Sequence, residues 1–227
     1  MEKSAENEIQ HLQFQGREEL KAYLEKAKNE LDEHLNCDQI KRLQEQLETK
    51  LKEDNQPINE LEDLYLQLGE LCVKKNRYAE GLKMYEEYYK LKTNQSSESR
   101  VSDVPILNTI AKLNIHLNFL EDAAQNLNEA LNILGNDDGE NDVLIAETFK
   151  NIALFLIQQG RYADALANIN QSLEYLEKLE NEAENYKFEI LETKFLQMRI
   201  CAHLSLIKEM NQLFEANFQE FQEYKAR

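Results

Sequence analysis

Proline and glycine are scarce in this sequence. Its 227 residues include two prolines and six glycines. Strands joined by tight turns need these residues, whereas long helices avoid them. Leu, Glu, Gln, Lys and Ala dominate instead, and these residues lose little conformational freedom in a helix. The composition therefore predicts an all-α chain.

Cysteines and long apolar runs are also few. The three cysteines, Cys37, Cys72 and Cys201, lie far apart and form no CxxC pair, which excludes the usual zinc and redox motifs. We expect buried thiols in a reducing compartment. No run of about 18 apolar residues could span a membrane. The first residues, MEKSAENEIQ, lack the apolar stretch of a secretory signal, so we expect a cytoplasmic protein.

Basic residues are outnumbered by acidic ones. The chain has 26 Lys and Arg against 43 Asp and Glu, a formal net charge of −17. This excess argues against nucleic acid as the main partner, because phosphates would be repelled. A solvated acidic surface that keeps the protein soluble accounts for the charge. An acidic groove for a basic peptide is the alternative.

Motifs of catalysis are missing. The sequence contains no glycine-rich phosphate loop, no HExxH and no GxSxG. Four histidines are scattered along the chain, and none has a cysteine or carboxylate partner at an evident metal-ligand spacing. We therefore expect no enzyme, no metal and no cofactor, although folding could still bring two of the many carboxylates together.

A sequence pattern recurs with a period of 42 residues. The segments KKNRYAEGLKMYEEYYKLK (74–92) and QQGRYADALANINQSLEYL (158–176) share the order basic, Tyr, Ala, acidic, small, Leu, and NFLEDAAQNLNEALNIL (118–134) lies midway between them. Small residues obey the same period at two places in each unit. These residues are Gly69, Ala111 and Ala153, and then Gly81, Ala123 and Ala165. Three units in register predict a repeat protein.

Each unit has the pattern of a helical hairpin. Apolar residues recur at helical spacing, and the small residues allow two helices to approach closely. Asn76 and Gly160 can end the first helix in the left-handed conformation. A further step of 42 residues gives the apolar Leu204, Ile207 and Phe195 without the small residues, so the last unit has drifted. The predicted helices are 58–75, 78–93, 104–117, 120–135, 143–159, 162–181, 184–203 and 205–225.

The N-terminal part differs from these repeats. Residues 1–15 are expected to be flexible, 16–55 to form a helical pair, and 56–227 to contain the repeats, at about 58–93, 104–135, 143–181 and 184–225. The pair, with helices at about 17–35 and 37–53, is a degenerate repeat or a cap. A short coiled coil is the rival interpretation, because Ile40, Leu43, Leu47 and Leu51 are spaced 3, 4 and 4.

The segment AETFKNIALFLIQQGRYADALANINQSLEYLEKL (146–179) resembles the tetratricopeptide repeat family. The resemblance is close over 58–181 and loose over 184–225. The 42-residue period, longer than the usual 34, is similar to that of kinesin light chain. The resemblance implies a right-handed superhelix of antiparallel helical hairpins (an α-α superhelix), with protein binding in place of catalysis.

In that family the first helix of each hairpin lines a concave groove that binds peptides. Helical periodicity projects five candidate residues onto this face: Asn108, Lys112, Lys150, Asn151 and Arg199. Asparagine can both donate to and accept from a peptide backbone, and the three cations could hold an acidic or extended segment. The negative charge is then expected outside the groove centre. Ordinary solvated side chains of an amphipathic helix are the alternative.

Three phenylalanines form a stripe on the last predicted helix. Phe214, Phe218 and Phe221 are spaced 4 and 3, so they share one helix face. The stripe either caps the last hairpin or docks another chain. We expect a scaffold or adaptor that binds a peptide or protein segment within a larger assembly. Alternatives are a regulatory sensor of a short signal peptide and a purely structural subunit, which could be cytoskeletal, motor-associated or ciliary, using its ends or convex face.

Overall fold

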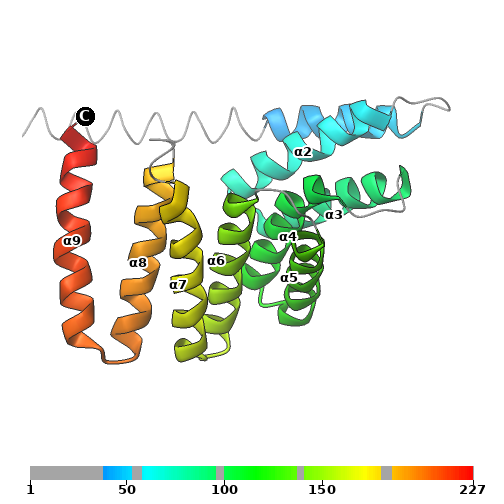
Figure 1. Cartoon of the computed structure of the whole chain (residues 1–227). Coiled ribbons are helices and arrows are strands. Elements are labelled where there is room, and N and C mark those ends of the chain that lie inside the picture. The colour runs from blue at the N-terminus through cyan, green and yellow to red at the C-terminus, as the bar shows by residue number, and fades with distance from the viewer. Residues whose placement is uncertain (1–37, 53–57, 96–99, 137–140, 180–185, 227) are drawn as a thin grey trace, which may run out of the picture. The chain divides into compact units, whose positions relative to one another are not determined.

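The computed structural model describes residues 38–52, 58–95, 100–136, 141–179 and 186–226. The expected flexible segment 1–15, the expected helix 17–35 and Cys37 lie outside the described residues. The elements are a helix over 38–50, α2 (Ile58–Lys74), α3 (Tyr78–Gln95), the short 3-10 helix η1 (Val101–Asp103), α4 (Val104–His116), α5 (Leu120–Gly135), α6 (Asp142–Gln158), α7 (Tyr162–Leu179), α8 (Lys187–His203) and α9 (Ile207–Ala226) (Figure 1).

The chain divides into two compact units, Met1–Leu71 and Cys72–Arg227. The division falls inside α2, whereas the sequence places a boundary near residues 55 and 56. In the described part of the first unit, Ile40 and Leu47 are buried on the helix over 38–50, and Leu61 and Leu68 are buried on α2. Their helical spacing explains why both segments form amphipathic helices. No helix in the described ranges is long and apolar enough to cross a membrane.

The second unit is built from antiparallel helical hairpins. Figure 1 shows α6, α7, α8 and α9 side by side in chain order. Ala111 and Ala123 are fully buried where α4 packs against α5. Ala153 and Ala165 are fully buried at the same place between α6 and α7. The small residues of the 42-residue pattern therefore lie where the two helices of each hairpin approach closely.

The same turn closes each described hairpin. One residue with a left-handed backbone follows the first helix in every case: Asn76 (φ 58°), Asn118 (φ 63°), Gly160 (φ 72°) and Ser205 (φ 58°). In the third turn the Arg161 N–H donates to the Leu156 carbonyl at 2.9 Å, and in the fourth the Leu206 N–H donates to the Cys201 carbonyl at 2.9 Å. This is the hydrogen bond of a Schellman motif. The positive φ angles confirm the predicted left-handed positions at Asn76 and Gly160.

The turn positions explain the drift of the last unit. They are separated by 118 − 76 = 42, 160 − 118 = 42 and 205 − 160 = 45 residues. Thr148 and Thr193 are likewise equivalent, because both are fully buried and each donates to the carbonyl four residues earlier. Their separation is also 193 − 148 = 45. The three additional residues therefore precede the core of α8, and all of α8 and α9 follows a frame shifted by three.

Candidate functional site

A groove with a volume of about 600 Å³ crosses the first helices of three successive hairpins. We refer to it as the α4/α6/α8 groove. Each hairpin contributes its first helix, so the groove depends on the repeat and not on a single loop. Its lining residues are Lys112, Ile115 and His116 from α4, Lys150, Leu154, Ile157 and Gln158 from α6, and Glu192, Phe195, Leu196 and Arg199 from α8.

Apolar side chains make up much of the lining of this groove. Ile115, Leu154, Ile157 and Leu196 come from all three helices. Phe195 also lines the groove and remains 43% exposed. A half-exposed aromatic ring beside aliphatic side chains is typical of the anchor positions in protein interfaces. The groove can therefore accept an apolar side chain of a ligand.

Cations from each hairpin also line the groove. Lys112 comes from α4, Lys150 from α6 and Arg199 from α8. The Lys150 ammonium forms an ion pair with the Glu192 carboxylate at 2.8 Å, which links α6 to α8. Lys112 and Arg199 form no ion pair among the residues that the structure describes. Two of the three cations are therefore available to an acidic ligand.

Two carboxylates accompany these cations. Burial raises the pKa of Glu192, but the hydrogen bond from Lys150 and the charges of Lys150 and Lys112 outweigh burial, so this pKa is lowered. Burial raises the pKa of Glu147 above the ordinary carboxyl value, and the nearby lysines offset this only in part. The expectation that negative charge lies outside the groove centre is therefore wrong. Glu147 was missed, although its spacing of three from Lys150 puts both on one helix face.

Asn108 and Asn151 do not face the groove. Their side chains are 0% and 1% exposed. The Asn108 amide donates to the Thr148 hydroxyl at 2.9 Å, and the Asn151 amide donates to the Asn108 carbonyl at 3.3 Å. Both bonds join α4 to α6. The predicted direction of these side chains is wrong because neighbouring first helices also pack against each other, and a buried amide needs a partner there.

Histidine side chains at two helix ends stack on tyrosines. His116 ends α4 and lines the groove, and its ring stacks on Tyr78 with centroids 4.8 Å apart. His203 ends α8 and stacks on Tyr162 with centroids 4.4 Å apart. In each case the tyrosine begins a second helix and the histidine ends the first helix of the next hairpin. The stack fixes His116 at the edge of the groove.

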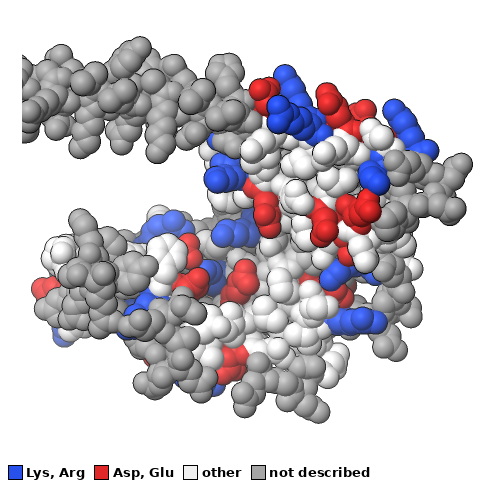
Figure 2. Space-filling view, turned by 90° about the horizontal axis from the view of Figure 1, so that it is seen from above, with Lys and Arg blue, Asp and Glu red and all other residues white. Residues whose placement is uncertain are grey.

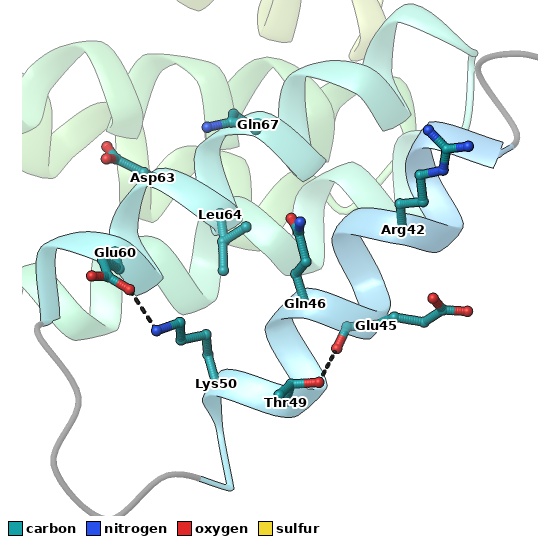
Figure 3. A pocket seen from close by; sticks show the side chains of 9 residues that line it. All are labelled: Arg42, Glu45, Gln46, Thr49, Lys50, Glu60, Asp63, Leu64 and Gln67. Atoms are coloured by element: carbon teal, nitrogen blue, oxygen red, sulfur yellow. Dashed lines mark hydrogen bonds and ion pairs between the residues drawn. The ribbon is translucent and has the colours of Figure 1, made fainter.

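A second hollow lies in the first unit, between the helix over 38–50 and α2 (Figure 3). Its volume is also about 600 Å³. Arg42 and Lys50 line it together with Glu45, Glu60 and Asp63, and Lys50 is paired with Glu60 at 2.7 Å. Apart from Leu64, the side chains that line this hollow are charged or polar, which is typical of a solvated cleft. The α4/α6/α8 groove is the stronger candidate, because it combines its cations with apolar side chains from three helices.

The acidic excess is not gathered on the face seen in Figure 2. Lys and Arg side chains are interspersed there with Asp and Glu among the described residues. A patch of one sign, which a strongly acidic interface would need, is not visible on that face.

No family model matches the chain, and no curated protein matches it. Solved structures do match. BtubC (BKLC) from P. vanneervenii has a TM-score of 0.65 at 17% identity, over 82% of this chain and 72% of that chain. The TPR-like repeats of a Podosopora anserina putative kinesin light chain have a TM-score of 0.64 at 11% identity, over 85% of this chain and 89% of that chain.

The chain has the tetratricopeptide-type repeat fold. The two likenesses confirm the predicted fold class, an all-α superhelix of antiparallel helical hairpins, and the predicted resemblance to kinesin light chain repeats. A Rap protein complexed with Competence and Sporulation Factor shares the fold, with a TM-score of 0.62 and 17% identity over 73% of this chain and 44% of that chain. At such identities the likeness concerns the fold, so any function rests on this chain's own residues.

Proposed function

We propose that this chain is a protein-interaction scaffold that binds an extended segment of another protein in the α4/α6/α8 groove. One observation carries the proposal: Lys112, Lys150 and Arg199, from three successive hairpins, line one groove together with apolar side chains. The fold supports it, since the Rap protein that shares this fold was solved with Competence and Sporulation Factor. The cytoplasmic location and the role as an adaptor in a larger assembly remain predictions.

The groove chemistry indicates what such a segment carries. Phe195 and the aliphatic residues around it favour an apolar side chain. Lys112 and Arg199 favour a carboxylate close to it, because they have no ion-pair partner among the described residues. Asn108 and Asn151 support the groove from behind by joining α4 to α6. Among the residues projected from the sequence, we therefore keep Lys112 and Arg199 as direct contacts, whereas Lys150 is held in its ion pair with Glu192.

Charge reversal in the groove tests this proposal. Partners are captured with the full chain and with the double variant Lys112→Glu, Arg199→Glu, and are identified by mass spectrometry. Lys83→Glu, Lys208→Glu is the matched control, because both lysines are exposed and neither lines the groove. We expect the groove variant to lose partners that the control keeps. Recovery of the same partners at the same yield by both variants would refute the proposal.

The phenylalanine stripe favours a second role, as a subunit that docks another chain. Phe214 and Phe218 are 53% and 51% exposed, and their rings stack with centroids 5.9 Å apart. The side chain of Phe221 lies outside the described residues. Large exposed aromatic side chains that adjoin one another are typical of interaction surfaces. We propose this stripe as a docking surface distinct from the groove.

A further inference from the structure

The phenylalanine stripe on α9 occupies helix positions that are buried by the next helix in the earlier hairpins. The frame of 45 residues relates Phe214 to Ile169 and Phe218 to Leu173, because 214 − 169 = 45 and 218 − 173 = 45. On α7, Ile169 and Leu173 are 0% and 7% exposed. Ile169 packs in a core cluster with Ile200 of α8, and Leu173 packs in another with Ile190 of α8. These positions of α7 therefore help to form the joint to the next hairpin.

The joint before it is built in the same way. Leu127 of α5 is related to Ile169 by 169 − 127 = 42, and it is 3% exposed. It packs in a cluster with Ile152 and Phe155 of α6. Leu127 on α5 and Ile169 on α7 are therefore both buried, in part by the first helix of the following hairpin. On α9 the equivalent Phe214 is half exposed, and no helix among the described residues covers it.

We propose that the stripe on α9 docks an amphipathic helix of a partner protein, which packs on α9 as α8 packs on α7. This inference rests on the docking role proposed above and names its occupant. The joint from α7 to α8 supplies the template. The docked helix presents apolar side chains about one helical turn apart, because Phe214 and Phe218 are four residues apart and their ring centroids are 5.9 Å apart.

The polar edge of the joint indicates a charge on the partner helix. At the joint from α7 to α8, the Gln197 amide donates to the Asn170 side-chain oxygen at 2.8 Å. The equivalent of Asn170 on α9 is Glu215, because 215 − 170 = 45, and Glu215 is exposed. An ionised carboxylate only accepts hydrogen bonds. A Lys or Arg of the partner helix, at the place of Gln197, complements it best.

Charge disfavours a second copy of this chain as the occupant. A twofold contact through α9 would place the exposed Glu209 and Glu215 of both copies in one interface. Each copy also has a formal net charge of −17. Like charges oppose such pairing. The same carboxylates attract a helix with basic edges, so electrostatics favour a different protein.

A helix with the α8 sequence is the natural probe. Two labelled peptides span residues 187–203 with Cys201→Ser, one with Gln197→Lys and one with Gln197→Glu. Their binding to the full chain is measured by fluorescence anisotropy. We expect the Lys peptide to bind more tightly, by roughly two- to five-fold, as for an exposed ion pair. The variant Glu215→Lys should reverse that order.

Variants of the stripe test where the peptide binds. Phe214→Ser, Phe218→Ser should weaken binding at least about ten-fold, because two aromatic anchors are lost. Phe214→Leu should largely retain it. Phe119→Ser is the matched control, since Phe119 is 49% exposed but lies between α4 and α5. Circular dichroism confirms that each variant is folded.

Three outcomes would overturn the inference. The first is no saturable binding up to about 1 mM peptide. The second is binding that the serine variant does not affect. The third is a dimer of the full chain in sedimentation that the serine variant dissociates, because a second copy would then be the occupant. The groove variant Lys112→Glu, Arg199→Glu should leave peptide affinity unchanged, so a failure of the stripe is distinct from a failure of the groove proposal.

Discussion

Two asparagine side chains hold neighbouring first helices together at the level of single residues. The Asn108 amide reaches Thr148, and the Asn151 amide reaches the Asn108 carbonyl. Both side chains are buried, so each bond replaces contacts with water that folding removes. The distance between α4 and α6, and hence between Lys112 and Lys150, depends on these bonds. Positions that the sequence assigns to ligand contact therefore act on the shape of the groove.

Asn151→Ala should lower the free energy of unfolding. The change removes a buried hydrogen bond and leaves a small cavity, at a cost of about 1–3 kcal/mol. Thermal denaturation measures it. Asn168→Ala is the control, because Asn168 donates only to the Asp164 carbonyl of its own helix. An alanine variant of Asn151 that lost partner affinity without losing stability would instead identify Asn151 as a direct ligand contact.

Glu192, which lines the groove, and Glu147, which interacts with the groove lysines, should respond to pH in opposite ways. The pKa of Glu147 is raised, mainly by burial. The folded chain therefore favours the protonated carboxyl, and ionisation of Glu147 opposes folding as the pH rises past the ordinary carboxyl pKa. The pKa of Glu192 is lowered by Lys150 against the effect of burial, so its ionised form supports folding above the ordinary carboxyl pKa and this support is lost as the pH falls.

Glutamine variants check these signs. At neutral pH, Glu147→Gln should raise the melting temperature and Glu192→Gln should lower it. Both differences should shrink in acid, well below the ordinary carboxyl pKa, because the native carboxyls are then protonated. Melting curves recorded at the two pH values measure both differences. A stabilising effect of Glu192→Gln at neutral pH would contradict the structure.

At the level of elements, helix bounds follow from local signals in the sequence. The observed α2 to α9 lie within a few residues of the predicted ranges. Apolar spacing sets the buried face of each helix, and a left-handed residue ends each first helix. The direction of Asn108 and Asn151 does not follow, because periodicity alone cannot distinguish solvent from a neighbouring first helix. The three additional residues before the core of α8 also disguised the equivalence of Phe214 with Ile169.

The hairpin turns allow a test with two glycines. Gly160 has φ 72° and Gly135 has no left-handed φ, and an added Cβ would contact nothing within 4 Å at either position. Gly160→Ala should lower the free energy of unfolding by about 1–2 kcal/mol, because an alanine must adopt the left-handed backbone conformation that its Cβ disfavours. Gly135→Ala, at the end of α5, should stabilise by up to about 1 kcal/mol. Denaturant unfolding measures both changes. Equal effects of the two substitutions would contradict the left-handed conformation of Gly160.

At the level of the whole molecule, the repeat distributes one binding surface over several hairpins. Each of α4, α6 and α8 supplies a cation and apolar side chains to the groove, in a chain whose formal net charge is −17. Sequence periodicity could predict the three cations, because they lie on the exposed side of amphipathic helices. It could not predict the Lys150–Glu192 ion pair, which depends on how two hairpins stack.

A cross-link from inside the groove tests the proposed binding surface most directly. A photo-reactive amino acid replaces Phe195 in the full chain, and a second protein carries it at Phe119 as the control. After irradiation with the partners captured above, mass spectrometry identifies the linked segments. We predict that position 195 links to an extended segment with an apolar residue beside an acidic one, and that Lys112→Glu, Arg199→Glu abolishes the link. Links from position 119 alone, or links from 195 that survive the charge reversal, would contradict the groove proposal.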